Sequence, residues 1–167
     1  MLIRAATHAD IPQIHAVTAA AFGQVAEADL IEALGDAGHV TLSLVAADDH
    51  GEVAGHVLFS PVGIPGVAGL AVGLAPIAVA PEYQRRGLGA ALVREGLRQL
   101  HGDGVAAVVV LGDPGYYRRF GFTPASRFGL SCPYDVSGDY FMALELSPGA
   151  LAGANGVVGY APEFAAL

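Results

Sequence analysis

The chain has 167 residues, of which 53% are hydrophobic and 14% charged, a composition typical of one globular domain and not of a disordered segment. Eight arginines, no lysine and 16 carboxylates give a net charge of −8, which disfavours non-specific binding of nucleic acid and mildly favours cationic partners. The single cysteine, Cys132, excludes an intramolecular disulfide, and a thiolate metal site would need partners that the chain lacks, so no metal is expected.

The N-terminal part of the chain is predicted to hold a short strand and two helices. Residues 2–6 form the strand, and a helix capped by Thr7 or Asp10 runs to about Phe22. Residues 26–38 have the pattern of a second helix, which a glycine ends.

The middle of the chain is predicted to hold a hairpin and then a strand-helix-strand unit. Residues 40–47 and 53–60 are strands that the turn DDHGE joins. A third strand at 73–80, a helix at 88–100 and an apolar strand at 105–112 follow. A right-handed crossover would make the last two strands parallel.

The C-terminal part of the chain is predicted to begin with a short helix that Asp113 caps and Pro114 opens. Two more strands follow, at 121–125 and 138–146. The tail, 147–167, is rich in glycine and proline but carries enough apolar residues to pack back. These elements predict an α/β fold in one domain over residues 1–167, with a central mixed sheet.

The stretch from Val53 to Pro81 has no charged residue and is long enough to span a bilayer. Its interior is interrupted by Pro61, Pro65 and Pro76, which alternate with Gly63, Gly66, Gly69 and Gly73 and would leave backbone groups unsatisfied in lipid. The N-terminus also lacks the apolar segment of a signal peptide. We therefore expect strand, loop and strand here, no membrane partner, and a cytoplasmic protein.

The stretch PEYQRRGLGAAL lies where a strand is predicted to turn into a helix. A helix start presents free N–H groups and the positive end of the helix dipole, which together bind anions. Gly87 and Gly89 would let a phosphate approach the backbone closely. Six of the eight arginines gather near this turn and the later short helix, namely Arg85, Arg86, Arg94, Arg98, Arg118 and Arg119. The sequence therefore predicts a polyanionic ligand at residues 84–89.

The residues around these glycines distinguish between three known phosphate-binding motifs. A P-loop needs a lysine, which this chain lacks, and a dinucleotide motif needs a third glycine where Leu92 stands. The run from Gln84 to Gly89, QRRGLG, instead has the form QxxGxG, and YYRRFGF has the form YxxxGF. The pair resembles the GNAT superfamily of acyl-CoA-dependent N-acetyltransferases. GHVLFSPV and VVVLGDPGYYRRFGF are similar to its YhbS-like subgroup.

The resemblance implies a sheet that splays at its two parallel middle strands, and acetyl-CoA as cosubstrate. Backbone groups of Ile77, Ala78 and Val79 would pair with the pantetheine arm. Amides would hold the pyrophosphate at Gln84, Arg85, Arg86, Gly87, Leu88, Gly89 and Ala90. Tyr117, four residues before Gly121, falls on the general acid that protonates the departing thiolate.

Acetyl transfer also needs a neutral amine, and the source of the general base is open because residues 73–80 carry no carboxylate. His56 is the candidate base, since it stands in the strand expected beside the cofactor strand and histidine titrates near neutrality. A histidine satisfied in the core or facing solvent is the favoured alternative. Tyr116 is expected to serve packing, Asp113 to cap a helix, and Cys132 to be inert.

The predicted function is acetyl transfer from acetyl-CoA to a primary amine by direct attack in a ternary complex. A non-catalytic acyl-CoA-binding or sensing domain is one alternative, and a nucleotide-binding protein with a similar turn is another. The acceptor site is expected between the first two helices, the loop 63–73 and the segment 127–139. An aminoglycoside, a polyamine, an amino acid or a protein N-terminus would each fit the acidic surface, and no motif speaks to oligomeric state.

Overall fold

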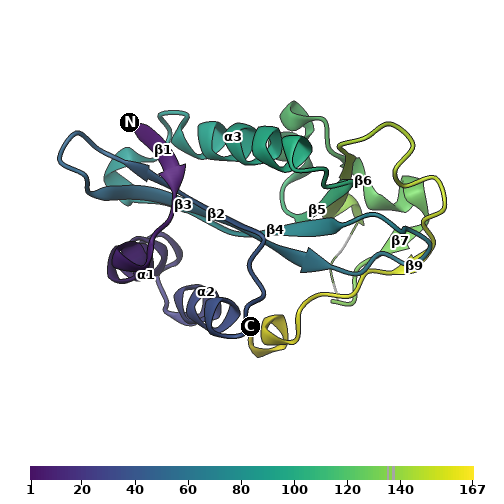
Figure 1. The fold of residues 1–167 in the computed structure, drawn as a ribbon, viewed down its shortest axis with the longest axis horizontal. Helices are drawn as coiled ribbons and strands as arrows, with labels where there is room; N and C mark the ends of the chain where they lie inside the picture. The colour runs from purple at the N-terminus through teal and green to yellow at the C-terminus, as the bar shows by residue number, and fades with distance from the viewer. Residues whose placement is uncertain (135, 137) are drawn as a thin grey trace.

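A seven-stranded mixed sheet forms the centre of the computed structural model, which describes residues 1–134, 136 and 138–167 (Figure 1). The strand order is β1-β2-β3-β4-β5-β8-β6, and β7 and β9 form a separate two-stranded sheet. The helices are α1 (Ile11–Phe22), α2 (Ala26–Asp36), α3 (Leu88–Gly102) and α4 (Pro114–Tyr117). The strands are β1 (Leu2–Ala5), β2 (Leu42–Ala47), β3 (Val53–Val62), β4 (Ala71–Val79), β5 (Ala107–Leu111), β6 (Thr123–Pro124), β7 (Leu130–Ser131), β8 (Phe141–Glu145) and β9 (Gly156–Val157). This architecture confirms the predicted α/β fold with a mixed sheet.

The central strands pair as predicted. β2 and β3 form an antiparallel hairpin, in which Leu42 lies opposite Phe59 and Val45 opposite His56. β4 and β5 are parallel, with α3 between them in the chain. The predicted order of strand, helix and strand is therefore confirmed.

Two of the later strands are shorter than predicted. The strand expected at 121–125 is reduced to β6, because Gly121 has a left-handed φ of 97° and a 3-10 turn begins at Ala125. The strand expected at 138–146 begins only at Phe141, after a 3-10 turn. The tail adds β9, which was not predicted.

The sheet splays between β4 and β5. The two strands pair only from Ala71 to Leu74, opposite residues 107–110, and β4 then continues to Val79 with β3 as its partner. Pro76, which has no N–H to donate, lies just past the last β5 pair. This divergence agrees with the splayed parallel strands expected from the sequence and leaves one edge of β4 open beyond Leu74.

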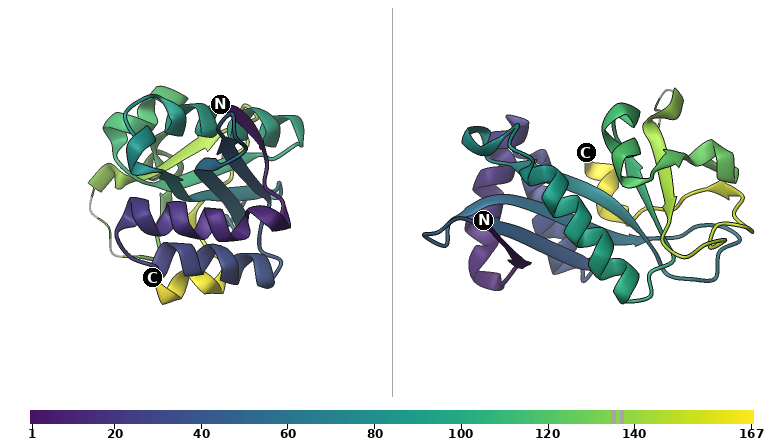
Figure 2. Two further views of the ribbon diagram at one scale, coloured as in Figure 1. Left: turned by 90° about the vertical axis from the view of Figure 1, so that its left-hand side faces the viewer. Right: turned by 90° about the horizontal axis from the view of Figure 1, so that it is seen from above.

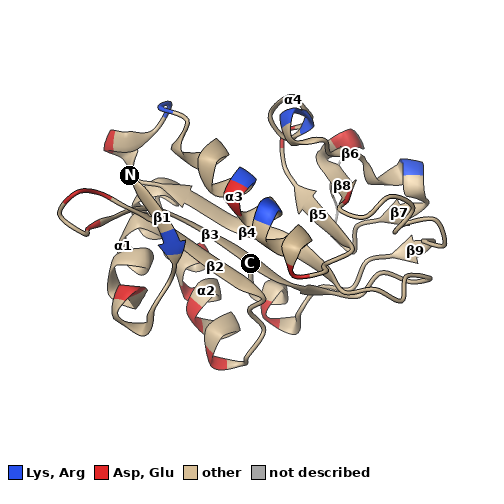
Figure 3. Cartoon of the chain, turned by 45° about the horizontal axis from the view of Figure 1, so that its top comes forward, with Lys and Arg blue, Asp and Glu red and all other residues tan. Residues whose placement is uncertain are grey.

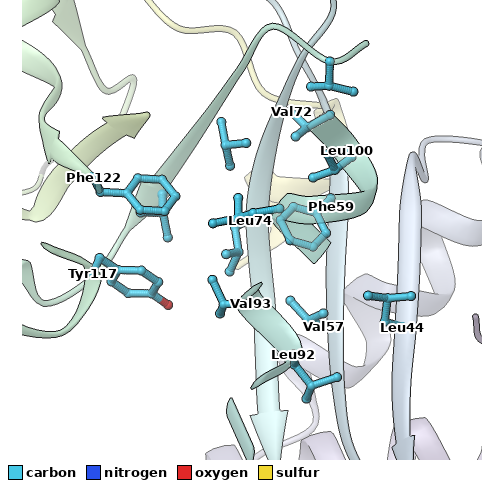
Figure 4. Packing of buried hydrophobic residues seen from close by; sticks show 14 of the residues in the cluster. Leu44, Val57, Phe59, Val72, Leu74, Leu92, Val93, Leu100, Tyr117 and Phe122 are labelled. Atoms are coloured by element: carbon cyan, nitrogen blue, oxygen red, sulfur yellow. The ribbon is translucent and has the colours of Figure 1, made fainter. Parts of the chain in front are cut away.

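Helices cover both faces of the sheet, α1 and α2 on one side and α3 on the other (Figure 2). Under α3, Leu92 and Val93 belong to one buried cluster with Val57 and Phe59 of β3 (Figure 4). The helix comes close because residue 96 is glycine, where a Cβ would lie 2.5 Å from the Phe59 ring. Successive side chains of β3 point to opposite faces of the sheet, so every second one lies on the face that α1 and α2 cover.

No helix in the part of the chain that the structure describes is long and apolar enough to cross a membrane. The uncharged stretch between Val53 and Pro81 folds as most of β3, a connecting loop and β4. That order is the strand, loop and strand expected from its prolines and glycines.

An ion pair between Arg4 and Asp10 ties β1 to the start of α1. The guanidinium donates to both carboxylate oxygens, at 2.7 and 2.9 Å, and the Thr7 N–H donates to the same carboxylate at 2.7 Å. The Arg4 hydrogen bond, helped by the smaller contribution of Thr7, holds the pKa of Asp10 well below its usual range. Asp10 therefore contributes stability as a carboxylate.

We expect Asp10→Asn to lower the free energy of unfolding by about 1–2 kcal/mol at pH 7, because it removes a charge-assisted hydrogen-bond acceptor near a helix start. The folded-state pKa lies below the unfolded value of about 3.9, so this stability is present above that pH and is lost as the pH falls. Urea titrations of both proteins at pH 7 and pH 3 measure the effect. A difference between the two proteins that is equally large at both pH values would contradict this role.

Candidate functional site

The bend between β4 and α3 collects main-chain N–H groups at the start of a helix. Arg85 and Gly87 have left-handed backbone angles, with φ of 63° and 81°. The first α3 hydrogen bond runs from the Ala91 N–H to the Gly87 carbonyl, at 3.0 Å. The N–H groups of residues 88–90 therefore precede the helical ladder. Successive amides in such a bend, at the positive end of the helix dipole, can hold an anion.

Gln84 contributes to the bend mainly through its side chain. Its Nε2 donates to the Val79 carbonyl at 3.0 Å, which ties the turn to the end of β4. Its N–H is directed to the Pro81 carbonyl at 3.4 Å, so this amide is already engaged. Within the predicted set 84–90, the amides nearest the helix start are the better anion donors.

The arginines near the bend divide into two groups. Arg85 and Arg119 line a hollow of about 360 Å³ at the turn, and Arg119 also stacks 4.3 Å from the Tyr116 ring. Arg94 lies over the Phe120 ring, with its guanidinium carbon 5.1 Å from the ring centroid. Arg98 instead forms an ion pair with a glutamate of its own helix. Figure 3 shows the basic residues over the turn, α3 and α4, whereas acidic residues follow α2.

Three adjoining hollows form one groove, which runs from the turn through a second hollow into a larger cavity. The hollow at the turn and the second hollow, of about 320 Å³, share Val79, Gln84, Gly89 and Tyr116. The second hollow shares Phe22 and Ile77 with a cavity of about 600 Å³. Tyr116, which was expected to serve packing, is therefore a wall of the groove.

The open edge of β4 forms one side of this groove. The Ala80 N–H donates to the Ala54 carbonyl of β3 at 2.8 Å. Because hydrogen-bonding groups alternate along an antiparallel strand, those of Ala78 point to β3, and those of Ile77 and Val79 point to the open edge. Ala78 thus lines the groove, but its backbone is not free to pair with a ligand as expected from the sequence.

Tyr117 lines the larger cavity. Its side chain is 7% exposed and packs edge-on against Phe122, with ring centroids 5.8 Å apart (Figure 4). Gly112 makes room for it, since a Cβ there would lie 2.2 Å from the Tyr117 ring. Burial, with a smaller contribution from Tyr116, raises the pKa of Tyr117 to about 12. The phenol is therefore protonated at neutral pH and can act as a proton or hydrogen-bond donor.

The larger cavity is mostly apolar and aromatic. Its walls are Phe22, Glu27, Leu30, Leu74, Ala75, Pro76, Ile77, Leu111, Tyr117, Tyr134, Tyr160, Phe164, Ala165 and Leu167. Tyr160 joins the rings on the C-terminal side, 5.6 Å from Tyr134 and 5.3 Å from Phe164 between centroids. A cavity of this volume, lined by rings and few polar groups, is typical of a small-molecule site.

Some of the segments predicted to form the acceptor site line this cavity. The first two helices contribute Phe22 and Glu27, and the segment 127–139 contributes Tyr134. Residues 135 and 137 of that segment lie outside the described part of the chain. No residue of the loop 63–73 lines the cavity, although the structure describes all of them. The C-terminal segment takes that place, because it packs against α2.

His56 lies on the other side of β3 from the α3 cluster. It has no exposed surface, and its Nε2 lies 2.8 Å from the Ser43 hydroxyl oxygen. Burial lowers its pKa to about 4, so the ring is neutral at physiological pH. It does not line any of the three hollows of the groove, as far as the described residues define them. These observations favour the alternative of a histidine held in the core.

Two of the remaining predictions concern single residues. Asp113 caps the short helix α4, because its carboxylate accepts from the Gly115 N–H at 2.9 Å, as expected. Burial raises the pKa of the Cys132 thiol, which keeps it in its less reactive protonated form.

Comparison with known proteins agrees with this geometry. Residues 2–125 match the model of a family described as acetyltransferase (GNAT) domain. The chain is 44% identical over 164 residues to the uncharacterised N-acetyltransferase YhbS of Escherichia coli K12, which covers 98% of each chain. It is 39% identical over 132 residues to YjhQ of the same organism, covering 76% of this chain and 72% of YjhQ.

Solved structures give the same result. The crystal structure of YhbS from Escherichia coli in complex with CoA has a TM-score of 0.94 and 43% identity, and covers 98% of this chain and 91% of that one. A GNAT family acetyltransferase from Brucella melitensis in complex with acetyl-CoA has a TM-score of 0.80 and 39% identity, covering 98% and 97%. With the family model matching most of its length, this chain belongs to the GNAT family of acetyltransferases.

Proposed function

We propose that this protein transfers the acetyl group of acetyl-CoA to a primary amine by direct attack in a ternary complex. The observation that carries the proposal is the continuous groove, which joins the anion-binding bend to the cavity at Tyr117. The relatives crystallised with CoA and with acetyl-CoA support the choice of cosubstrate. One ligand can fill the groove while a second occupies the cavity.

The cofactor would lie along the groove with its pyrophosphate at the bend. Main-chain N–H groups of residues 88–90 would bind the phosphate oxygens, and Arg85 and Arg119 would add positive charge. The pantetheine amides would pair with Ile77 and Val79 at the open edge of β4, as an added strand does. This course brings the thioester to Tyr117.

The reaction needs few groups from the protein. The lone pair of the amine attacks the thioester carbonyl carbon, a C–N bond forms, and a main-chain N–H of the β4 edge can stabilise the oxyanion. The C–S bond then breaks, and the Tyr117 hydroxyl donates to the departing sulfur. The proton that the attacking nitrogen loses passes to water. The products are an N-substituted acetamide and CoA.

The pKa of Tyr117 limits how it can assist. Its value of about 12 lies above that of an ordinary thiol, about 8.5, so full proton transfer to a free thiolate is uphill. Tyr117 therefore acts chiefly by hydrogen bonding to sulfur while negative charge develops there. Any phenolate that forms regains its proton from water.

Two measurements test the proposed function. Calorimetric titration with CoA, with ATP and with NAD distinguishes a CoA site from a nucleotide site. We expect CoA to bind and ATP and NAD not to bind. Release of CoA thiol from acetyl-CoA with a panel of primary amines then separates an enzyme from a sensing domain. Tight CoA binding without amine-dependent thiol release would favour the non-catalytic alternative and would overturn the proposal.

The pH dependence of the rate follows from the pKa of Tyr117. The active form is protonated, so activity is retained until the pH rises through about 12, and the rate should climb with pH as the substrate amine loses its proton. We expect kcat/KM for the amine to increase from pH 6.5 to pH 10 without a descending limb. Thiol release, corrected for a blank without amine, measures it. A descending limb centred below pH 10 would contradict the assignment of Tyr117.

A further inference from the structure

The larger cavity combines two kinds of group, aromatic rings and a side-chain carboxylate. Five of its walls are aromatic side chains, contributed by the end of α1, the α4 helix, the loop before β8 and the C-terminal segment: Phe22, Tyr117, Tyr134, Tyr160 and Phe164. Its one carboxylate among the described walls is Glu27 of α2. No arginine or histidine of the described residues lines it.

Glu27 is held in place by its own helix start. The side-chain amide of Gln24 donates to both carboxylate oxygens, at 3.0 and 3.2 Å. Each oxygen keeps acceptor capacity for a further donor. The same helix carries three more carboxylates outside the cavity, Asp29, Glu32 and Asp36, and no basic residue, so Glu27 belongs to an acidic helix (Figure 3).

We propose that the acceptor is a small primary amine with an apolar, ring-sized body, of the arylalkylamine class, whose amino group is received at Glu27. This inference rests on the proposed acetyl transfer and names its second substrate. The rings of the cavity would enclose the body, and aromatic faces also attract an ammonium group. The amine would lie beside Tyr117, where the thioester ends.

The same walls disfavour the hydrophilic acceptors. A polyamine or an aminoglycoside would bury several charged or hydroxyl groups against leucine, proline and phenylalanine side chains, with few partners for them. The phenols of Tyr117 and Tyr160 stay neutral, because burial raises the pKa of each. They offer at most one or two neutral hydrogen bonds. The walls therefore suit an acceptor molecule that has one cationic end and one apolar body.

A long acyl chain of the cosubstrate is the other apolar occupant of such a cavity. It would bring apolar atoms against the Glu27 carboxylate and leave it with the Gln24 amide as its only donor from the described residues, which is unfavourable. An amine supplies a further donor, so the structure favours the amine over the acyl chain.

The test compares acceptors at fixed acetyl-CoA concentration. We expect kcat/KM for 2-phenylethylamine to exceed the values for ethanolamine and putrescine by about 10- to 100-fold, as burial of one ring predicts. Preferential turnover of putrescine, or of an alanine-terminated hexapeptide, would overturn the inference. A higher kcat/KM for octanoyl-CoA than for acetyl-CoA, with ethanolamine as acceptor, would also overturn the inference, because it would place the acyl chain in the cavity.

Two pairs of variants locate the acceptor. Glu27→Gln should raise KM for 2-phenylethylamine about tenfold, whereas Glu32→Gln, on the same helix but outside the cavity, should not. Ala165 and Ala166 are both exposed, but only Ala165 lines the cavity. Ala165→Trp should therefore narrow the cavity and raise the KM for 2-phenylethylamine. Ala166→Trp should leave this KM unchanged. Equal KM values within each pair would overturn the inference.

Titration of CoA into each variant separates this inference from the proposed function. If CoA binds the unaltered protein and 2-phenylethylamine is not acetylated, the assignment of the acceptor is wrong while the cofactor site stands. If CoA does not bind, the proposed acetyl transfer itself fails.

Discussion

Replacement of Tyr117 by phenylalanine should lower kcat about 100-fold while leaving the affinity for CoA unchanged. General acid catalysis usually contributes about 100- to 10,000-fold. We expect the lower end of that range because the pKa of the Tyr117 phenol, about 12, makes it a weak acid. Phenylalanine keeps the ring that fills the space beside Gly112, so the fold should be unaffected. Steady-state thiol release and calorimetric titration with CoA measure the two quantities.

The matched control for this variant is Tyr140→Phe. Tyr140 is exposed and lies outside the groove and the cavity, so its hydroxyl should not affect turnover. If Tyr117→Phe and Tyr140→Phe have the same kcat, Tyr117 does not assist the departing thiol. If Tyr117→Phe also loses CoA binding, the hydroxyl supports cofactor binding and its role is not confined to the departing thiol.

Replacement of Gly89 by valine should weaken CoA binding about 100-fold, or about 2.7 kcal/mol, by filling the groove. A Cβ at this position would lie 3.3 Å from the Tyr116 hydroxyl and 3.7 Å from Val79 Cγ2. The branched side chain would therefore stand between Tyr116 and the open edge of β4, on the course proposed for the pantetheine. Calorimetric titration with CoA measures the loss.

Gly102→Val, at the end of the same helix, provides the comparison. A Cβ there meets nothing within 4 Å, so the substitution adds the same side chain without touching the groove. Thermal denaturation of both variants should show two folded proteins. Unchanged CoA affinity in Gly89→Val would mean that the cofactor does not follow this groove.

The cofactor half of the site could be predicted from sequence because its geometry is local. A strand end, two glycines and a helix start within QRRGLG fix the backbone of the proposed anion site, and Tyr117 stands on a short helix with its own cap. Such features leave a signature within a few residues. Tyr116 was missed as a wall of the groove because an aromatic residue in a core and one in a cleft look alike in sequence.

The acceptor half depends on contacts between distant segments. Its walls come from the ends of α1 and α2, from Tyr134 and from the C-terminal segment, and only tertiary packing brings them together. The face of β3 that His56 occupies was also unpredictable. Both faces of that strand are buried, so the sequence has no alternation of polar and apolar residues to reveal it.

The stretch of β4 beyond Leu74 pairs with β3 alone, and the proposed cofactor would supply the missing neighbour on its other edge. Bound CoA should then stabilise the fold. At a CoA concentration 100 times Kd, mass action alone raises the free energy of unfolding by about 2.7 kcal/mol. Without ligand, the exposed ladder groups are few, and Pro76 beside them cannot donate to an intruding chain, which limits the risk of aggregation there. Preparations kept with CoA should therefore store better than preparations stripped of it.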